Sequence, residues 1–270
     1  MLEMNLDVPK ANWLQKRLLL TAIAIVRQFR PRNGSVLMLT NGLCVKYGSR
    51  IDPVEAQTML FLSKSSNIPV PRVHLTFAHN GCTYILMERI HGQQIAKDWV
   101  KKTEASKKAV LENLKKTIHE MRTIPAMGTA VANVNGGSLY DPRMPCDTGR
   151  FGPFPDFHAF HDYLRDDIQD HENHEPDVRK LIDLHGQQWD GPTFTHGDLS
   201  SLNILTRADE IVGIIDWETA GWYPSYWEYT TASQVNPQNT FWKDEIDRFL
   251  EPMPKALAME QLRQQFFGDF

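Results

Sequence analysis

The sequence has 270 residues, of which 41% are hydrophobic and 23% are charged, and its formal net charge is −4. These values fit a globular protein with a buried core, and the lack of a basic excess argues against a nucleic acid as partner. Three widely spaced cysteines, Cys44, Cys82 and Cys146, argue against a disulfide framework and favour a reducing compartment.

The longest apolar run covers residues 18–26, which is far short of the ~20 residues that a membrane span requires. Its basic flanks resemble a signal peptide, but the first nine residues hold Glu3 and Asp7 and no cationic side chain. We therefore expect a cytoplasmic protein with no membrane partner, and we interpret residues 12–29 as a buried helix.

Turn signals separate short apolar segments over the first third of the chain. Asn41-Gly42 predicts a type I′ turn, and Asn80-Gly81 predicts a second hairpin turn. The expected elements are strands over residues 36–39, 43–47, 73–77 and 83–87 and a helix over residues 54–64, with extended chain at the prolines of residues 68–71. We therefore predict a small N-terminal lobe, residues 1–88, that contains a sheet.

Helical periodicity dominates the rest of the chain. The expected helices cover residues 105–124, 157–168 and 178–185 and the chain from residue 226 on, with short strands at 194–196, 203–205 and 211–215. Residues 125–155 are rich in glycine and proline and predict a long ordered loop. The second lobe, residues 89–270, is therefore expected to be mainly helical, and the fold class is α+β.

Two segments, THGDLSSLNIL at residues 195–205 and GIIDWE at residues 213–218, have the pattern that phosphoryl transfer needs. The reaction needs a carboxylate beside the attacking hydroxyl, metal ligands, and positive charge on the phosphates. Asp198 lies in a tight loop, Asn203 begins a strand, and Asp216 ends the next strand. A short hairpin brings Asn203 and Asp216 side by side, and their oxygens are ligands suited to Mg²⁺.

The order His-x-Asp-x-x-x-x-Asn, followed by an apolar strand that ends in Asp, resembles the catalytic and metal loops of kinase-like enzymes. With Gly after the His and Trp-Glu after the second Asp, it is similar to the aminoglycoside phosphotransferase and choline kinase family. The segments IPVP, YILME, GPF, AGWYP and YWEY are similar to a fungal-type branch. This resemblance, from about residue 39 to residue 229, implies a two-lobed protein kinase-like fold.

The resemblance also implies roles for individual residues. Asp198 is implied to be the catalytic base, and Asn203 and Asp216 to bind Mg²⁺. Lys46, at the end of a strand, is implied to hold the phosphates of ATP and to be held itself by Glu55. On the residues alone, Lys46 and Glu55 also fit an ordinary pair of solvated surface residues.

Residues 87–90 are the expected hinge between the lobes. Backbone groups of Glu88 and Ile90 are implied to meet the purine edge of ATP, although an ordinary linker has the same sequence character. The glycine-rich loop of protein kinases is missing, and the turn at residues 32–35 is the only small turn before the lysine strand. The loop that covers the phosphates is therefore unassigned.

Two further features have two interpretations each. Acidic residues from Asp162 to Glu172 fit either a site for a cationic acceptor or a solvated helix face. Six aromatic residues fit either a wall of the acceptor pocket or core packing. They are Trp217, Trp222, Tyr223, Tyr226, Trp227 and Tyr229.

The expected function is an ATP- and Mg²⁺-dependent phosphotransferase that acts on a hydroxyl of a small molecule. The alternatives are a catalytically silent nucleotide-binding domain of the same fold and, less favoured, a protein kinase, because no Ala-Pro-Glu segment follows Asp216. The sequence does not identify the acceptor, because one fold serves many substrates.

Overall fold

The computed structural model describes residues 8–30, 32–126, 128–144, 149–235 and 237–268. The chain forms two compact units, Met1–Lys97 with Leu202–Glu218, and Asp98–Ser201 with Thr219–Phe270. This division differs from the boundary predicted after residue 88, because strand β5 pairs with strand β9 from the far part of the sequence. That pairing joins residues 89–97 and the hairpin after residue 202 to the first unit.

The first unit holds most of the strands. Its elements are α1 (Trp13–Val26), β1 (Val36–Met38), β2 (Leu43–Gly48), α2 (Val54–Ser65), β3 (Val73–His79), β4 (Cys82–Glu88), β5 (Gln93–Gln94), most of α3 (Ile95–Asp98), β9 (Ile204–Arg207), β10 (Glu210–Ile214) and most of the 3₁₀ helix η2 (Trp217–Thr219).

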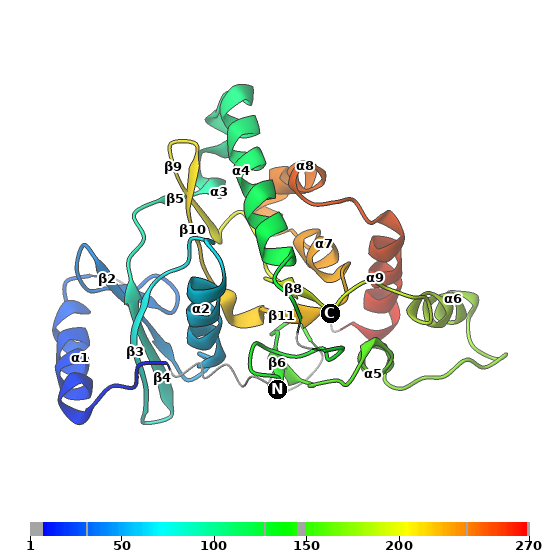
Figure 1. The fold of residues 1–270 in the computed structure, drawn as a ribbon, viewed down its shortest axis with the longest axis horizontal. Helices are drawn as coiled ribbons and strands as arrows, with labels where there is room; N and C mark the ends of the chain where they lie inside the picture. The colour runs from blue at the N-terminus through cyan, green and yellow to red at the C-terminus, as the bar shows by residue number, and fades with distance from the viewer. Residues whose placement is uncertain (1–7, 31, 127, 145–148, 236, 269–270) are drawn as a thin grey trace. The chain divides into compact units, whose positions relative to one another are not determined.

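The main sheet has the antiparallel order β1-β2-β4-β3, and α1 and α2 lie on its opposite faces (Figure 1). Successive side chains of a strand point to opposite faces. Val45 of β2 therefore packs in one apolar cluster with Leu19 and Ile23 of α1. The next residue, Lys46, faces α2 and contacts Glu55 there. The strand period thus places a buried lysine against a helix.

The two hairpin turns of this sheet are built differently. Asn80 and Gly81 have φ values of 49° and 72°, as a type I′ turn requires. Asn41 and Gly42 are not in the left-handed region, so the type I′ turn predicted there is wrong. The hydroxyl of Thr40 accepts the N–H groups of Gly42 and Leu43, at 3.2 and 3.1 Å, and this side-chain acceptor shapes the turn instead.

A second sheet has the order β10-β9-β5. Asn203 and Asp216 lie at the open end of its β9-β10 hairpin. The N–H of Ile215 donates to the carbonyl of Asn203 at 2.9 Å, and the N–H of Ile214 donates to that of Pro69 at 2.7 Å. The end of β10 is therefore fixed to the proline-rich segment of the first unit. This connection sets the backbone position from which Asp216 projects.

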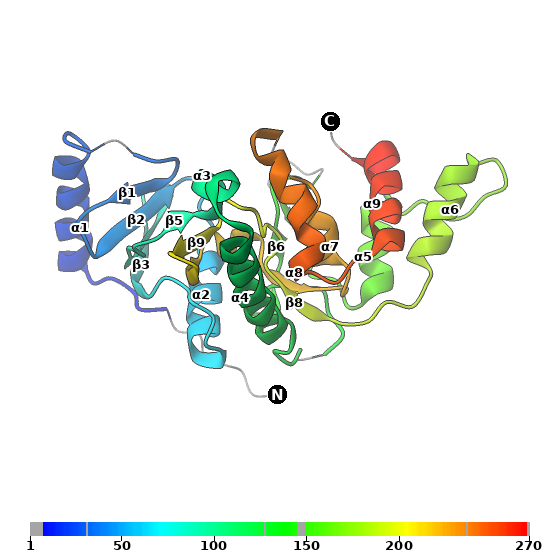
Figure 2. The ribbon, with the colours of Figure 1, turned by 90° about the horizontal axis from the view of Figure 1, so that it is seen from above.

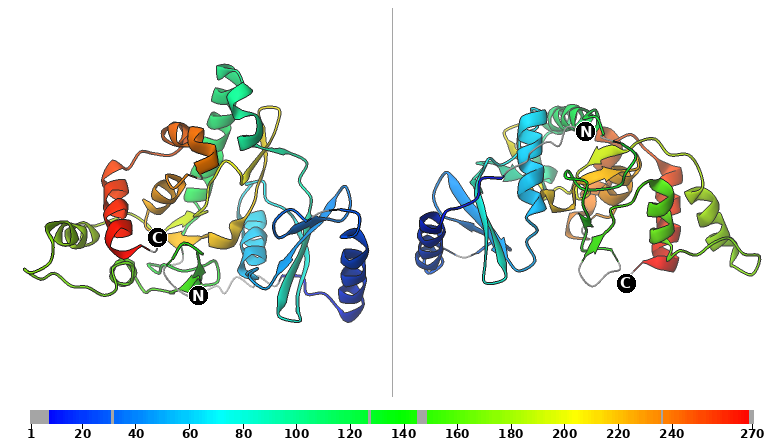
Figure 3. Two further views of the ribbon diagram at one scale, coloured as in Figure 1. Left: turned by 180° about the vertical axis from the view of Figure 1, so that it is seen from behind. Right: turned by 60° about the horizontal axis from the view of Figure 1, so that its bottom comes forward.

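The second unit is mainly helical. Its elements are η1 (Trp99–Lys101), α4 (Glu104–Arg122), β6 (Leu139–Tyr140), β7 (Arg150–Phe151), α5 (Phe157–Leu164), α6 (Pro176–His185), β8 (Thr193–Thr195), β11 (Gly221–Tyr223), α7 (Trp227–Ala232), η3 (Pro237–Glu245), α8 (Ile246–Phe249) and α9 (Pro254–Phe267). In this unit α9 lies between α6 and α7 and contacts both (Figures 2 and 3).

Aromatic side chains fill the core of the second unit. Phe160, Tyr223 and Trp227 pack on one another, with ring centroids 5.1 to 6.0 Å apart. All six aromatic residues that the sequence analysis considered for an acceptor wall are buried. Tyr226 is fully buried, and its hydroxyl lies 2.7 Å from Nε2 of His161. The structure therefore favours core packing for this set.

Helix α5 ends at Leu164, four residues before the predicted end. Asp166 and Asp167 have φ values of 53° and 57° and so leave the helical conformation. Of the acidic residues considered for a cationic acceptor, only Asp162 lies on this helix. A continuous acidic helix face is therefore not formed.

Within the described residues, Cys44 and Cys82 are free thiols, and Cys146 lies outside them. Burial raises the pKa of Cys44 to about 11, so its thiol stays protonated at neutral pH. None of the described helices has both the length and the apolar character needed to cross a membrane.

Candidate active site

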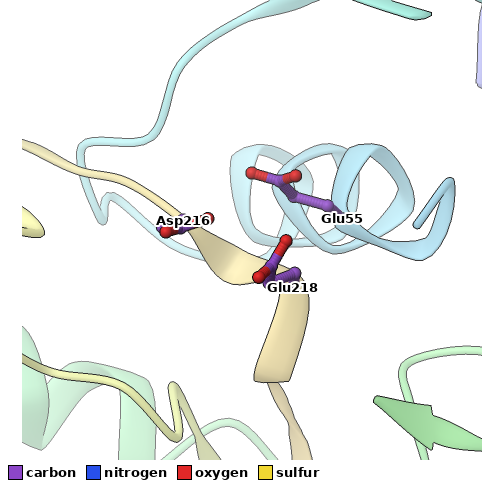
Figure 4. Close-up of side chains that lie close together, drawn as sticks. All are labelled: Glu55, Asp216 and Glu218. Carbon is purple, nitrogen blue, oxygen red and sulfur yellow. The ribbon is translucent and has the colours of Figure 1, made fainter. Parts of the chain in front are cut away.

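Lys46 lies among three carboxylates inside the first unit. Its Nζ is 2.7 Å from Oε2 of Glu55, 2.5 Å from Oδ1 of Asp216 and 3.2 Å from Oε2 of Glu218. Figure 4 shows Glu55 on α2 and the other two carboxylates on the chain that follows β10. Lys46 and Glu55 are 5% and 1% exposed, so the interpretation as a solvated surface pair is excluded.

Burial and charge act against each other in this cluster. Burial lowers the pKa of Lys46, but the carboxylates of Glu55, Asp216 and Glu218 more than offset this and hold the pKa above its ordinary value. Burial raises the pKa of Glu55 to about 7, against the opposing charge of Lys46. The lysine is therefore a fixed cation, surrounded by more negative than positive groups.

Asp216 has φ of +68°, in the left-handed region. Such a conformation costs a non-glycine residue about 1–2 kcal/mol, although aspartate tolerates it better than most. Strained residues that the surrounding structure holds in place occur often at functional sites. Asn203 is 7% exposed and precedes β9, opposite the end of β10 that leads to Asp216. The hairpin thus places both predicted metal ligands at the same end.

The predicted hinge, residues 87–90, covers the last two residues of β4 and the two residues that follow it. The N–H of Glu88 donates to the carbonyl of Arg72 at 2.9 Å, and its carbonyl accepts the thiol of Cys44 at 3.5 Å. The side chain of Ile90 lies over Gly213 of β10, where a Cβ would be 2.6 Å from Cδ1 of Ile90. A side chain at position 213 would therefore require the end of the Ile90 side chain to shift. Contacts of Glu88 and Ile90 with a purine stay a prediction.

Asp198 lies in the second unit, in the loop that follows β8. Gly197, just before it, has φ of +80°, and a Cβ there would be 2.9 Å from the carbonyl oxygen of Thr219. Only glycine combines this conformation with so close an approach. The backbone conformation and the close contact with Thr219 therefore require glycine at position 197.

Side chains hold the backbone of this loop from several directions. The buried carboxylate of Glu228 accepts the N–H groups of His196 and Gly197, at 2.6 and 3.2 Å. The hydroxyl of Thr219 donates to the carbonyl of His196 at 2.8 Å. Nδ1 of His196 accepts the N–H of Asp198 at 3.2 Å, so its ring helps to fix the loop. The predicted base is thus on a rigid loop.

Three charged residues of these sites had no role in the sequence analysis. Glu218 was noted as part of the DWE segment and Glu228 as part of the YWEY segment, but neither was assigned a partner. Arg143, in the long loop before α5, contacts the Asp198 loop. The presence of two glutamates among bulky aromatic residues was the available signal, since a buried carboxylate needs partners.

A sequence model of the family described as "Phosphotransferase enzyme family" matches residues 53–263. The chain belongs to this family. The predicted family and the predicted enzyme class, phosphotransferase, are therefore confirmed. The match begins after Lys46 and so does not include this lysine. In the structure Lys46 forms an ion pair with Glu55, which lies within the matched residues. No curated protein sequence matches this chain.

Solved structures with a similar fold include a thermostable mutant of aminoglycoside phosphotransferase APH(4)-Ia in its apo form. It is 16% identical, with 84% of this chain and 76% of that chain covered and a TM-score of 0.57. A ternary complex of this enzyme with ADP and hygromycin B is 17% identical, with 83% and 76% covered and a TM-score of 0.54. Another, with AMP-PNP and hygromycin B, is 17% identical, with 84% and 77% covered and a TM-score of 0.55. These similarities confirm the predicted α+β kinase-like fold.

Proposed function

We propose that this phosphotransferase moves the γ-phosphoryl group of ATP to a hydroxyl group of a small molecule. The observation that carries the proposal is the contact of one buried lysine, Lys46, with both Glu55 and Asp216. Phosphoryl transfer needs a fixed cation for the phosphates and a carboxylate for the metal close together. The ADP and AMP-PNP complexes of the similar APH(4)-Ia structures agree with ATP as the donor.

The residues around Lys46 fit a divalent metal ion. The ligand oxygens of Glu55, Asp216 and Glu218 lie within 4.8 Å of one another, and the one ammonium group balances only part of their charge. Carboxylate and amide oxygens are the ligands that Mg²⁺ prefers. We assign Asp216 and Asn203 as its ligands, with Glu218 as a further carboxylate nearby. When bound, Mg²⁺ would neutralise charge on the phosphate oxygens.

Asp198 is the proposed base. Its carboxylate would accept the proton of the acceptor hydroxyl while the hydroxyl oxygen forms a bond to the γ-phosphorus and the bond to the β-phosphate oxygen of ADP breaks. Positioning supplies most of the catalysis in such reactions. The three side chains that hold residues 196–198 support this role, because they restrict where the carboxylate can lie.

The nucleotide is proposed to bind through the N-terminal lobe, residues 1–88, with the purine edge at the backbone of Glu88 and Ile90. The acceptor is proposed to bind the C-terminal lobe, residues 89–270. A small hollow beside Asp198, whose mixed lining includes Thr231, Gln234 and Trp242, is where we place the approach of the acceptor hydroxyl. This placement differs from the acceptor wall considered in the sequence analysis, because Tyr226 of that wall is fully buried.

The test uses the purified protein, Mg²⁺ and ATP labelled at the γ-phosphate. A panel of hydroxyl-bearing metabolites is screened for label transfer, with Asp198→Asn as the control for background. Transfer that requires both Mg²⁺ and Asp198 supports the proposal. Saturable ATP binding with no transfer and no ATP hydrolysis would instead support the silent-domain alternative. Label transfer to added proteins alone would support a protein kinase.

A further inference from the structure

Arg143 connects the long loop before α5 to the loop that carries Asp198. Its Nε and Nη2 donate to the two carboxylate oxygens of Asp141, at 2.8 and 2.6 Å. Nη2 also donates to the carbonyl of Gly197 at 2.5 Å. Nη1 lies 4.0 Å from Oδ1 of Asp198. One guanidinium group therefore touches the loop at two consecutive residues.

Asp141 makes Arg143 rigid. Asp141 is 1% exposed, and Oδ1 also accepts the backbone N–H of Arg143, at 2.9 Å. The N–H of Asp141 in turn donates to the carbonyl of Gly149 at 2.8 Å. A planar guanidinium held at two nitrogens by a buried carboxylate loses little further freedom when it binds a third group. The contact with Gly197 is thus built into the fold.

We propose that Arg143 is a positioning residue for phosphoryl transfer. It holds the carbonyl of Gly197, while Glu228 holds the N–H of the same residue from the other side. Glycine has the largest conformational freedom of all residues, so its peptide needs such support. The proposal rests on the role of Asp198 as the base.

The distance between the side chains of Arg143 and Asp198 determines how Arg143 can act on the proposed base. At 4.0 Å, Nη1 is too far to hydrogen-bond with Oδ1, so this contact does not occupy a lone pair of that oxygen. The attraction between the charges still biases the side chain of Asp198 toward one orientation. Arg143 therefore orients the base without blocking it.

The experiment must remove the guanidinium without leaving Asp141 as a buried, uncompensated charge, because that would destabilise the fold. We therefore compare wild type with the double variant Arg143→Met/Asp141→Asn and with Arg143→Lys. Arg150→Met is the matched control, since Arg150 lies close by in the sequence, in β7, and donates to Oγ of Ser138. The readouts are steady-state ATP hydrolysis, with Mg²⁺ and water as acceptor, and hydrogen exchange at the amide of Asp198.

For the double variant we expect kcat to fall by about 10- to 100-fold with the KM for ATP unchanged, since a small displacement of a catalytic group has effects of this size. The amide of Asp198 should exchange at least about 10-fold faster, because its peptide is released. Arg143→Lys should restore part of kcat, because it keeps a positive charge near Asp198. Arg150→Met should match wild type in both readouts.

The inference is overturned if the double variant has the kcat and exchange rate of Arg150→Met, or if the KM for ATP rises as much as kcat falls. A wild-type protein with no turnover at all would refute the proposed function instead. In that case the exchange rate at Asp198 still decides the role of Arg143: faster exchange in the double variant supports it, and an unchanged rate overturns it.

Discussion

Nζ of Lys46 lies 2.5 Å from Oδ1 of Asp216, although 170 positions separate them in the sequence. The pair joins the lysine strand to the predicted metal loop within one compact unit. Glu55 completes the contact from α2, with an ion pair of 2.7 Å. Because Lys46 and Glu55 are buried, their charges interact more strongly than surface charges do. It is the structural basis for the first two predictions.

Replacing Lys46 by methionine should weaken ATP binding. The lost charge-assisted hydrogen bonds are worth about 1.5–3 kcal/mol, which corresponds to roughly 10- to 100-fold in affinity. The apolar stem of methionine still fills the buried site. Titration calorimetry with Mg²⁺·ATP measures the change, and Lys64→Met, at an exposed position of the same helix as Glu55, is the control. Equal affinity in the two variants would remove Lys46 from the phosphate site.

Asp216→Asn should abolish the dependence of nucleotide binding on Mg²⁺ and reduce turnover by about 10²-fold or more. Asparagine tolerates the left-handed backbone at φ +68°, so the fold should be kept. Asp216→Ala should lose activity equally and in addition lower the free energy of unfolding by about 1 kcal/mol. Glu210→Gln on the same hairpin is the control. Wild-type turnover in the Asn variant contradicts the metal assignment.

Asp198→Asn should reduce kcat by about 10²-fold and leave the KM for ATP nearly unchanged. The side chain keeps its shape but loses the charge that accepts the proton. Steady-state kinetics on an identified acceptor, or on water, makes the comparison. An equal change in kcat and in ATP affinity would indicate that Asp198 supports the structure of the loop rather than the reaction.

The sequence predicted the parts of the fold that depend on local patterns. The strand predicted over residues 43–47 is β2, and Asn80-Gly81 was correctly placed as a hairpin turn. Asn41-Gly42 has the same dipeptide, but the hydroxyl of Thr40 supplies acceptors that favour another turn. The early end of α5 likewise depends on left-handed residues that periodicity does not reveal. Local signals fail where a neighbouring side chain offers the backbone a competing partner.

The candidate site residues came from a different kind of signal, and their roles stay predictions. Lys46, Glu55, Asn203 and Asp216 came from the ordered motifs of a family resemblance. Arg143 was not found, because it lies in an aperiodic loop and acts through contacts 54 residues away. Contacts of this kind are set by tertiary packing, and no local pattern in the sequence marks them. The residues that support a catalytic loop are therefore harder to predict than the residues that carry the chemistry.

Glu228→Ala should destabilise the protein and impair catalysis together. It leaves the buried N–H groups of His196 and Gly197 without their acceptor, at a cost of about 1–3 kcal/mol each. Glu228→Gln should also destabilise, because one of its two acceptor oxygens becomes an NH₂ donor that faces an N–H. Urea unfolding and kcat are measured on the same samples. Wild-type stability in both variants would show that Glu228 does not hold the loop.

A buried histidine pair should make stability depend on pH. Nδ1 of His161 donates to the carbonyl of His185 at 3.0 Å, and Nε2 of His161 accepts the hydroxyl of Tyr226. Nδ1 of His185 accepts from Nη1 of Arg165 at 3.2 Å, so both rings are neutral. Burial lowers the pKa of His161 to about 4 and that of His185 to about 2, with Arg165 acting in the same direction.

The direction of the pH dependence follows from the lowered pKa values of His161 and His185. The unfolded chain protonates its histidines near pH ~6.5, whereas the folded protein does so only at lower pH. Stability is therefore complete above pH ~6.5 and falls as the pH decreases, by about 1.4 kcal/mol per pH unit for each histidine. His185→Gln keeps an acceptor for Arg165 and removes one titrating group, so urea unfolding between pH 4.5 and 7.5 should show a slope smaller by about one proton. The exposed His171→Gln should keep the wild-type slope, and an equal slope in all three proteins would contradict the prediction.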